Sequence, residues 1–348
     1  MIRVVVAEDS STARALLVSM FESDPEFQVV GEAGDGREAV ELVRKLRPDL
    51  VTMDVRMPHM DGLEATRRIM VEVPTPIIVV SATLDNDDVA ASMRAIRAGA
   101  LTALAKPPGP GAPDFEVGRA RFLATVRALS SVKVVGHRLR TLSRNWPAPK
   151  TGVQPRLRGS IVALAASTGG PGALRSVLDA LPFDFPVPIL VVQHLSPGFL
   201  GGFVEWLGST CRLPIKIAAQ GDQLTRGTVY IAPEDRHLTV TGQGQVRFTA
   251  DAPVDGFRPS ASVLFESVAN LYGRSAVAAI LTGMGRDGVI GLRRIRELGG
   301  RIIAQDEQTS SVWGMPAAAI DEGLADFVLP ISMVPAKLVE MVSQESKE

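Results

Sequence analysis

A serine stands near the middle of the chain, where a strand-like pattern gives way to a glycine-rich turn. The apolar run Ser160–Ala166 leads into Ser167, and Thr168–Gly172 then holds three glycines and a proline before a helix-like stretch. Such a turn places a serine beside the free backbone N–H groups of a helix start, which suits a nucleophile with an oxyanion hole. The same geometry suits phosphate binding, so this motif alone leaves both chemistries open.

A serine hydroxyl needs a base, and the chain has four histidines: His59, His137, His194 and His237. The first falls in a loop of the N-terminal part, the second in a linker region, and the last at the start of a pair of short strands. His194 ends the apolar strand pattern that begins at Val187, so it stands at a strand C-terminus, as Ser167 does. This placement favours His194 as the general base.

The third residue of such a site is an acid near another strand end, and Asp287 is the candidate. Asp287 follows the strand pattern Ser275–Thr282 across a glycine-rich loop and precedes the helix-like stretch Val289–Leu298. A helix N-cap is the alternative role for an aspartate in this position. A catalytic triad is recognised by the roles of its members and not by chain order, so the order serine, histidine, aspartate is acceptable.

A second group of polar residues marks the strand ends of the N-terminal part. Glu8 and Asp9 follow the first strand pattern and Asp54 the third, while Ser81 ends the fourth and Lys106 the fifth. In an open parallel sheet these ends face one crevice. Three carboxylates there would repel one another unless a hard cation joins them, and Mg²⁺ prefers such oxygen ligands. The hydroxyl and ammonium groups at the same rim then predict a phosphoryl site around Asp54.

The elements that must position this second group alternate short apolar runs with amphipathic stretches. The runs are rich in valine and isoleucine, as strands covered on both faces should be. Helical spacing of apolar residues predicts helices over Gly36–Leu46 and Gly62–Glu72, and a last helix over about Arg119–Val132. Five such units predict a doubly wound parallel sheet, an α/β fold. The expected strands are Arg3–Ala7, Val29–Glu32, Asp49–Asp54, Pro76–Ser81 and Leu101–Ala105.

A proline- and glycine-rich stretch, Pro107–Pro113, ends the first pattern, and a basic segment with further prolines leads to a second pattern that starts at Ser160. Shorter strands are expected over Thr228–Ala232, Leu238–Thr241 and Val246–Thr249, with a hairpin turn between the last two. The second part is therefore expected to be a Rossmann-like α/β domain with an antiparallel β insertion. The predicted division is a first domain over 1–128, a linker over 129–157 and a second domain over 158–348.

The composition fits a soluble globular protein and excludes several classes of function. Charged residues make up 22% of the 348 residues and the formal net charge is −1, so no broad attraction to nucleic acid or anionic lipid is expected. No apolar run is long enough for a membrane span, and the N-terminus lacks the pattern of a signal peptide. The single cysteine, Cys211, precludes an internal disulfide and fits a reducing, cytoplasmic location.

The acidic group resembles the flavodoxin-like receiver domain of two-component response regulators, over about residues 1–128. The run Met53–Leu63 and the pair Lys106-Pro107 carry the resemblance. It implies that Asp54 accepts a phosphoryl group from a histidine kinase, with Mg²⁺ as cofactor. The implied Mg²⁺ ligands are Glu8, Asp9, Asp54 and the Arg56 carbonyl, and the implied phosphoryl contacts are Ser81 and Lys106. Ala103 stands where receivers usually carry a switch aromatic residue.

The second pattern resembles the catalytic domain of the chemotaxis receptor methylesterases, over about residues 158–335, and that family joins it to a receiver in this order. The matching segments are Ala166–Gly170, Gln193-His194, Leu281–Gly288, Ala304–Ser310 and Gly314–Pro316. The resemblance implies that Ser167 attacks a glutamyl methyl ester, that His194 takes its proton and that Asp287 orients His194. It also implies the Met284 N–H as oxyanion donor and no cofactor for the esterase reaction. Ser262 stands where the family usually has an aspartate.

Together the two resemblances imply a methylesterase for chemotactic adaptation, whose receiver covers the esterase cleft until Asp54 is phosphorylated. Its partners would be methylated cytoplasmic helices of chemoreceptors and a chemotaxis histidine kinase. A monomer that neither enters the membrane nor binds nucleic acid is expected. Deamidation of receptor glutamines is open to the same acyl-transfer chemistry.

Three other functions are alternatives at this point. The second domain could be a non-catalytic docking module, although an intact serine, histidine and aspartate speak against it. The segment Ser167–Gly172 could cradle a phosphate in a nucleotide-using enzyme, but a GxGxxG fingerprint and a P-loop lysine are absent. A DNA-binding output is disfavoured because no basic recognition helix is evident.

Overall fold

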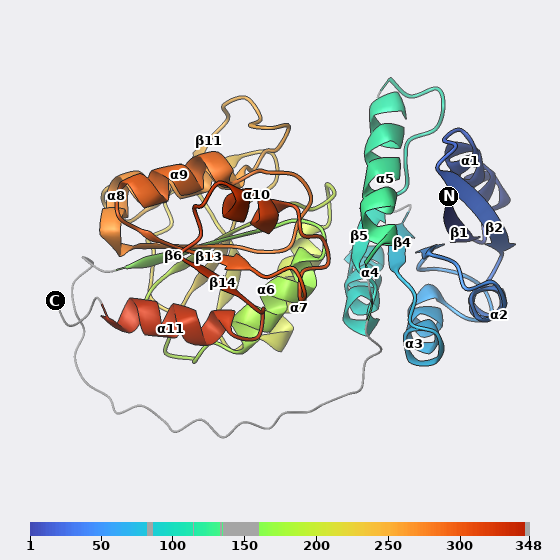
Figure 1. Cartoon of the computed structure of the whole chain (residues 1–348), viewed down its shortest axis with the longest axis horizontal. Coiled ribbons are helices and arrows are strands. Elements are labelled where there is room, and N and C mark those ends of the chain that lie inside the picture. Colours follow the sequence, from blue (N-terminus) through green and yellow to red (C-terminus); the bar gives the residue numbers. More distant parts are fainter. Residues whose placement is uncertain (82–85, 114, 133, 135–159, 345–348) are drawn as a thin grey trace.

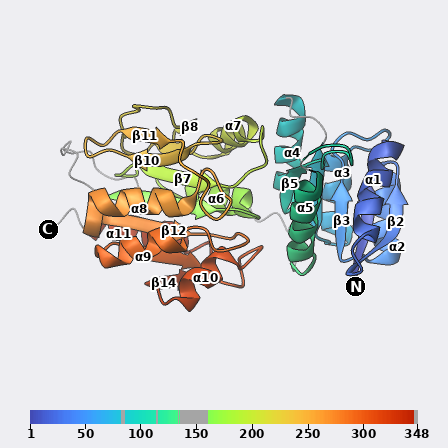
Figure 2. The same cartoon turned by 90° about the horizontal axis from the view of Figure 1, so that it is seen from above.

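Two α/β domains lie side by side in the computed structural model, which describes residues 1–81, 86–113, 115–132, 134 and 160–344 (Figure 1). Each domain is built on its own parallel sheet with helices packed against it (Figure 2). Most of the predicted linker, 129–157, lies outside the described residues. Within the described part of the chain, no helix has the length and apolar character needed to cross a membrane.

The sheet of the N-terminal domain confirms the predicted doubly wound topology. In the described residues its strand order is β2-β1-β3-β4-β5 and every pairing is parallel. The helices α2 (Gly36–Leu46) and α3 (Gly62–Glu72) begin and end where they were predicted. The strands are β1 (Ile2–Ala7), β2 (Phe27–Ala33), β3 (Leu50–Met53), β4 (Ile77–Ser81) and β5 (Thr102–Ala105), and the other helices are α1 (Ser11–Glu22), α4 (Asn86–Ala98) and α5 (Phe115–Ser130).

Side-chain caps explain where two of these helices start. Asp35 and Asp61 accept hydrogen bonds from backbone N–H groups in the first turns of α2 and α3. The last helix, α5, begins at Phe115 and not at Arg119 as predicted. Arg119 forms an ion pair with Glu116 at 2.8 Å across one helical turn, so the additional turn carries its own stabilising contact.

The C-terminal domain is built on a longer parallel sheet with the order β14-β13-β12-β6-β7-β9-β8 in the described residues. Every residue of its central strands β6, β7 and β12 is buried, as both faces of a covered parallel sheet require. The strands are β6 (Ile161–Ala166), β7 (Ile189–Gln193), β8 (Ile215–Ile217), β9 (Val229–Ile231), β12 (Ala276–Ile280), β13 (Arg301–Gln305) and β14 (Phe327–Leu329). The helices are α6 (Gly170–Asp179), α7 (Leu200–Thr210), α8 (Ala261–Tyr272), α9 (Val289–Glu297), α10 (Met315–Asp321) and α11 (Val334–Gln344).

The antiparallel insertion is smaller than the sequence predicted. β10 (His237–Val240) and β11 (Val246–Thr249) form an antiparallel pair joined by the expected turn. The strand predicted over Thr228–Ala232 does not belong to that insertion, because its core, β9, pairs in parallel with β7 and β8. All of β9 is buried, so it suits the interior of a parallel sheet better than a hairpin with one exposed face.

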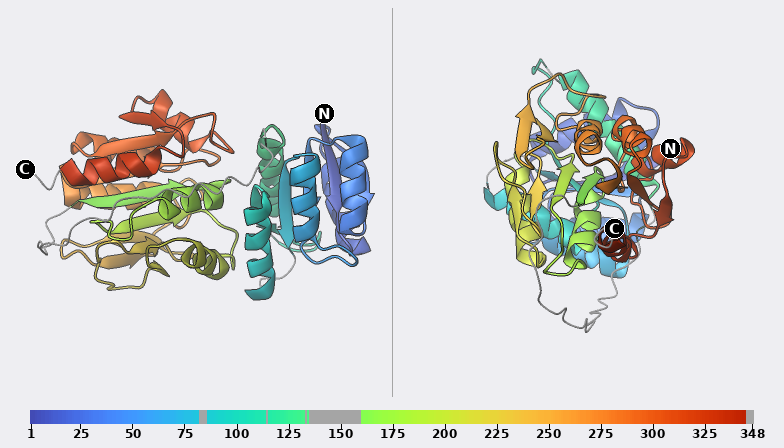
Figure 3. Two further views of the ribbon diagram at one scale, coloured as in Figure 1. Left: turned by 90° about the horizontal axis from the view of Figure 1, so that it is seen from below. Right: turned by 90° about the vertical axis from the view of Figure 1, so that its left-hand side faces the viewer.

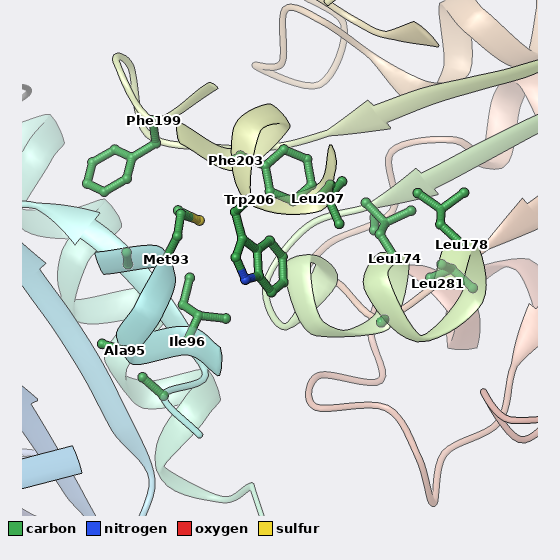
Figure 4. Close-up of a cluster of buried hydrophobic side chains, with 14 of the residues drawn as sticks. Met93, Ala95, Ile96, Leu174, Leu178, Phe199, Phe203, Trp206, Leu207 and Leu281 are labelled. Carbon is green, nitrogen blue, oxygen red and sulfur yellow. The ribbon is translucent and has the colours of Figure 1, made fainter. Parts of the chain in front are cut away.

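The domains contact each other through α4 of the first and α6 and α7 of the second. Met93 and Ile96 of α4 lie opposite Phe203 and Trp206 of α7, and all four side chains are buried (Figure 4). Val312 adds a second contact by packing against the core of the N-terminal domain. The carbonyl of Val312 is bonded to the loop that follows β12, so this contact lies at the C-terminal edge of the second sheet. The left-hand view in Figure 3 shows the same side-by-side placement.

Candidate functional sites

Glu8, Asp9 and Asp54 meet at the C-terminal edge of the first sheet, where β1 and β3 end. One carboxylate oxygen from each residue lies within 4.8 Å of the others. Lys106, which follows β5, places its Nζ 2.6 Å from Glu8 Oε2 and 2.8 Å from Asp54 Oδ2. The structure therefore brings together four of the residues that the sequence pointed to, from three different strands.

The acidic group carries more negative than positive charge, which favours binding of a cation. Burial raises the pKa of Glu8 to about 7, with Lys106 opposing the rise and Asp54 adding to it. Burial alone would lower the pKa of Lys106, but its hydrogen bonds to Asp54 and Glu8 outweigh burial and raise it. One ammonium group faces three carboxylates, so a hard cation with oxygen ligands fits the remaining negative charge. The donor set, with the Arg56 carbonyl close by in the chain, suits Mg²⁺.

Arg56 and Ser81 stand at the same rim. Ser81 is buried at the end of β4, and its carbonyl accepts the Lys106 N–H at 2.8 Å, so these two residues are neighbours. The Arg56 N–H lies 3.4 Å from Asp54 Oδ1. Arg56 also helps to line a cavity of about 570 Å³ that reaches the acidic group, together with Asp9, Asp61 and Arg94. Asp9 is the member of the acidic group that lines this cavity.

Ser167 lies directly after β6, in the turn that opens α6. Its N–H donates to the Thr282 carbonyl at 3.0 Å, and its own carbonyl accepts the Gly170 N–H at 2.8 Å. Gly169 has a φ of 77°, in the left-handed region that favours glycine, and a Cβ there would lie 2.4 Å from Ser311. The turn is therefore tight, and it holds Ser167 next to the N-terminus of α6.

His194, which directly follows β7, and Asp287, in the loop between β12 and α9, form a buried pair. Nε2 of His194 lies 2.9 Å from Oδ2 of Asp287, and the two side chains are 5% and 0% exposed. The His194 N–H donates to the Ala166 carbonyl at 3.0 Å, which places His194 beside Ser167. Because Asp287 occupies Nε2, the buried Nδ1 is the ring nitrogen left for the serine, and it has no hydrogen-bond partner among the described residues. Hydrogen bonds of this kind often form fully only with substrate bound.

The N-terminus of α8 holds Asp287, and sequence reasoning missed this contact. Ser260 Oγ donates to Oδ1 of Asp287 at 2.7 Å, and the Ala261 N–H donates to Oδ2 at 2.7 Å. Burial alone would raise the pKa of Asp287, but the hydrogen bonds from His194, Ala261 and Ser260 outweigh burial and lower it. The aspartate therefore stays ionised beside the imidazole over the whole neutral range.

Ser262, where the chain departs from the family pattern, belongs to the same network. Its N–H donates to Asp287 Oδ1 at 3.1 Å, and its hydroxyl accepts the Gly288 N–H at 2.8 Å. Gly288 is the N-cap residue of α9, so Asp287 binds the start of α8 and does not cap the helix that follows it. The serines at 260 and 262, directly before an apolar helix pattern, were the available signal for this helix start.

Gln193 and Gln305 support the turn that holds Ser167, and sequence reasoning also missed them. Gln193 Nε2 donates to the carbonyls of Ser167 and His194, both at 2.8 Å, so one amide ties the two residues together. Gln305 Oε1 accepts the N–H of Thr282 at 2.8 Å. Each glutamine is the buried last residue of its strand and follows a run of buried apolar residues, and a buried polar group in such a place needs a partner.

The loop after β12 passes against Ser167 and carries Met284, the predicted oxyanion donor. A Cβ on Gly283 would lie 2.8 Å from the Cβ of Ser167, so the two backbones are in close contact. The Gly283 N–H donates to the Val312 carbonyl at 3.0 Å. The next N–H, that of Met284, makes no hydrogen bond within the described residues, so it remains available as a donor.

The other histidines have different surroundings. His237 is fully buried, with its Nδ1 accepting the Ser260 N–H at 3.2 Å and its Nε2 3.2 Å from the Ala252 carbonyl. His59 is exposed in a loop of the N-terminal domain, and His137 lies outside the described residues. Among the described histidines, His194 is therefore the one that reaches the serine turn.

Comparison with known families matches both halves of the chain. A model described as CheB methylesterase matches residues 162–338, and one described as response regulator receiver domain matches residues 4–112. Together these two matches contain both groups of site residues.

Similar proteins extend over nearly the whole chain. Protein-glutamate methylesterase/protein-glutamine glutaminase 4 of Myxococcus xanthus is 51% identical, over 97% of this chain and 96% of its own length. Protein-glutamate methylesterase/protein-glutamine glutaminase 3 of Anaeromyxobacter dehalogenans is 50% identical, over 97% and 98%. Among solved structures, the CheB methylesterase catalytic domain of Thermotoga maritima superposes with a TM-score of 0.52 at 42% identity, and covers 53% of this chain and 99% of its own.

Proposed function

The chain belongs to the CheB methylesterase family in the form that carries a receiver domain, and we propose that Ser167, His194 and Asp287 are its catalytic residues. The protein is a hydrolase of glutamyl methyl esters and glutamine amides in proteins, and it acts in chemotactic adaptation. The observation that carries the residue assignment is the buried 2.9 Å pair of His194 and Asp287, set beside a serine at a helix N-terminus.

The geometry supports a two-step acyl transfer. Ser167 Oγ attacks the ester carbonyl carbon, and its proton passes to Nδ1 of His194, the nitrogen that Asp287 leaves free. The resulting imidazolium is stabilised by the ionised Asp287. His194 then protonates the departing methoxide, so methanol leaves and an acyl-enzyme remains. Water gives a proton to His194 as its oxygen attacks the acyl carbon. His194 then returns that proton to the departing Ser167 Oγ, which releases a glutamate side chain and restores the free serine. With glutamine as substrate, the leaving group is ammonia.

Charge that develops on the carbonyl oxygen needs donors in place beforehand. The Met284 N–H is the proposed oxyanion donor, because the neighbouring Gly283 N–H is already used and the loop abuts Ser167. The N-terminus of α6, which follows the serine turn, adds favourable dipoles. Removal of one oxyanion donor typically lowers kcat by about 10²–10³-fold.

In the receiver we assign Asp54 as the residue that accepts a phosphoryl group from a histidine kinase. Glu8, Asp9, Asp54 and the Arg56 carbonyl would hold Mg²⁺, which neutralises phosphoryl oxygens when it is bound. The ammonium group of Lys106, now paired with two carboxylates, is placed to contact the phosphoryl group. Ser81, its neighbour at the rim, would supply a hydroxyl contact.

The contact between the domains supports control by occlusion. The receiver packs against α7, against α6, whose first turn follows Ser167, and against Val312, whose carbonyl is bonded to Gly283 beside Ser167. Ser167 is 8% exposed. Phosphorylation of Asp54 would weaken the packing of α4 on α7 and open the cleft. A coupling of about 1–3 kcal/mol corresponds to roughly 5–150-fold control of activity.

The remaining assignments concern partners and boundaries. We propose methylated cytoplasmic helices of chemoreceptors as substrate, a chemotaxis histidine kinase as phosphodonor, and a monomer located in the cytoplasm. We retain the division into a receiver over 1–128, a linker over 129–157 and an esterase domain over 158–348. It is supported by the two separate sheets, whose strands fall within the first and third of these ranges.

Methanol release from methylated chemoreceptor membranes tests the assignment. The parent protein, Ser167→Ala and the matched control Ser176→Ala are compared with and without a small phosphodonor plus Mg²⁺. Ser176 is an exposed serine of α6, bonded to the Gly172 carbonyl, so its change should leave the rate unaltered. Release should rise with phosphodonor for the parent and the control and fall to background for Ser167→Ala. An inactive parent that also fails to react with a serine-directed phosphonate would instead favour a docking module.

A further inference from the structure

An aromatic side chain from outside the assigned triad lies flat on His194. The rings of Phe257 and His194 are stacked, with centroids 3.9 Å apart and planes inclined by 4°. Resting on the catalytic role assigned to His194 above, we propose that Phe257 is a positioning residue. Its ring fixes the orientation of the imidazole and stabilises the protonated form that arises during hydrolysis.

Phe257 is presented by a stiff hairpin between β11 and α8. The Val254 N–H donates to the Phe257 carbonyl at 3.1 Å, and the Phe257 N–H donates to the Val254 carbonyl at 2.9 Å. The two residues between them, Asp255 and Gly256, have φ angles of 51° and 82°. Positive φ at both central positions is the signature of a type I′ turn, whose twist suits a tight hairpin. The ring is therefore held on a short, defined turn.

Side chains on both sides tie this hairpin to the domain. Arg258 Nε donates to Asp235 at 2.9 Å, and Arg258 Nη1 donates to the Asp251 carbonyl at 3.3 Å. The buried His237 lies 3.2 Å from the Ala252 carbonyl. Because these contacts anchor its ends, the hairpin holds the Phe257 ring in a fixed position against the imidazole of His194.

The same segment reaches the other member of the catalytic pair. Three residues after Phe257, Ser260 donates its hydroxyl hydrogen bond to Asp287 at 2.7 Å. One stretch of chain thus contacts the face of His194 with a ring and the carboxylate of Asp287 with a hydroxyl. This arrangement couples the positions of the two side chains and matches the need for an imidazole held in one orientation.

The form of the stacking favours the charged imidazole. Two neutral aromatic rings prefer offset or edge-to-face packing, because their electron-rich faces repel each other. A cation over the same face is attracted, so the parallel placement of Phe257 suits imidazolium better than imidazole. In the proposed mechanism the proton of Ser167 passes to His194 during the attack, and an interaction with imidazolium that is stronger at that stage raises kcat. Among the described charged groups, Asp287 is the one bonded to the ring, and it acts at the edge and not on the face.

The test compares Phe257→Leu, Phe257→Tyr and the control Phe248→Leu in the full chain, activated by phosphodonor and Mg²⁺. Phe248 lies in β11 and packs on the domain core, so it controls for loss of an aromatic residue in this region. Methanol release from methylated chemoreceptor membranes gives kcat and KM, and thermal unfolding reports the fold. We expect Phe257→Leu to lower kcat by about tenfold with KM unchanged, Phe257→Tyr to keep at least half of kcat, and Phe248→Leu to match the parent.

Several results would overturn the positioning role. Full kcat in Phe257→Leu, a rate for Phe257→Tyr as low as that of Phe257→Leu, or a rise in KM alone would each reduce Phe257 to apolar filling or a substrate contact. Should Phe257→Leu fail to fold, Phe257→Met replaces it as the aliphatic variant with the same criteria. Ser167→Ala is measured in parallel: if it stays active, the triad itself is wrong, whereas an inactive Ser167→Ala with a fully active Phe257→Leu removes only the role of Phe257.

Discussion

The acidic site and the serine site both lie at the C-terminal edge of a parallel sheet. They differ in how their carboxylates are stabilised. In the receiver, Glu8 and Asp54 share the ammonium group of Lys106, Asp9 lies beside them, and the pKa of Glu8 rises to about 7. In the esterase, the carboxylate of Asp287 receives hydrogen bonds from backbone, hydroxyl and imidazole, and its pKa is lowered.

The acidic site therefore has excess negative charge that added ions can neutralise, whereas the serine site already holds its polar groups in hydrogen bonds from the chain. A cluster with excess negative charge changes its interactions strongly when a cation and a phosphoryl group arrive, which is what a switch requires. A carboxylate whose partners all come from the chain stays in one place, which is what an orienting group requires. Each prediction below tests one side of this comparison or the contact that joins the two domains.

The largest expected effect comes from breaking the preorganised pair. Asp287→Asn should lower kcat for methanol release by roughly 10³–10⁴-fold, because a neutral amide neither stabilises imidazolium nor selects the correct ring nitrogen. Asp251→Asn, an exposed aspartate of the same domain, is the control and should match the parent. Comparable rates for Asp287→Asn and the control would mean that Asp287 only closes the start of α8.

The next effect tests the contact between the domains. Ile96→Asp places a carboxylate in the buried cluster with Trp206 and should weaken docking of the receiver, since burial of an unpaired charge is costly. Activity without phosphodonor should rise, by up to the roughly 5–150-fold range of a typical coupling. Val71→Asp, at a position 74% exposed on α3, makes the same kind of change away from the contact. A variant that is inactive or unchanged without phosphodonor would argue against occlusion by α4.

The sequence predicts a site residue well when the pattern that marks it lies in the adjacent residues, and poorly when its role depends on a distant partner. Ser167, His194 and Asp54 each follow an apolar strand pattern, so adjacent residues predict their positions. Ser260 acts on a partner 27 residues away, and the start of α8 meets Asp287 only after both have folded against β12. Local patterns carry no such information. The serines predicted that a helix begins here, but they did not predict that its first turn would bind Asp287.

The contact face of α4 was hidden for a related reason. Met93 and Ile96 fit the apolar spacing of a helix that packs on its own sheet, so the sequence does not distinguish a core face from a face that meets another domain. The misassigned β9 shows the same limit for strands. Its few apolar residues suit a short hairpin strand or a buried parallel one, and only its pairing with β7 and β8 decides between them.

On the receiver side, the raised pKa of Glu8 predicts a loss of stability with rising pH. A folded-state pKa of about 7 against an ordinary value of 4.5 means that the folded state holds its proton more tightly. Stability is therefore highest below pH 4.5 for this group and falls as the pH rises towards 7 and above. Without Mg²⁺, the parent should lose about 2 kcal/mol relative to Glu8→Gln between pH 5 and pH 8. Calorimetric unfolding at several pH values measures this difference.

Added Mg²⁺ sharpens the same experiment. Metal binding requires the ionised carboxylate, so Mg²⁺ should restore stability to the parent at pH 8 and do little at pH 5. Glu8→Gln removes one ligand and should respond more weakly to Mg²⁺ at both pH values. Parallel stability curves for the parent and Glu8→Gln would show that the charge on Glu8 does not govern this site.

The smallest expected effect separates two neighbouring glycines of the serine turn. A Cβ on Gly170 would lie 2.0 Å from Gln193 Oε1, whereas a Cβ on Gly172 meets nothing within 4 Å. Gly170→Ala must displace the amide that holds the carbonyls of Ser167 and His194, so kcat should fall by about tenfold, as small misplacements of catalytic groups do. Gly172→Ala should keep kcat and stabilise the exposed side of α6 by roughly 0.5–1 kcal/mol, because alanine favours the helix. Methanol release and thermal unfolding of both variants measure the contrast, and equal kcat values would show that Gln193 does not need its present position to keep the site active.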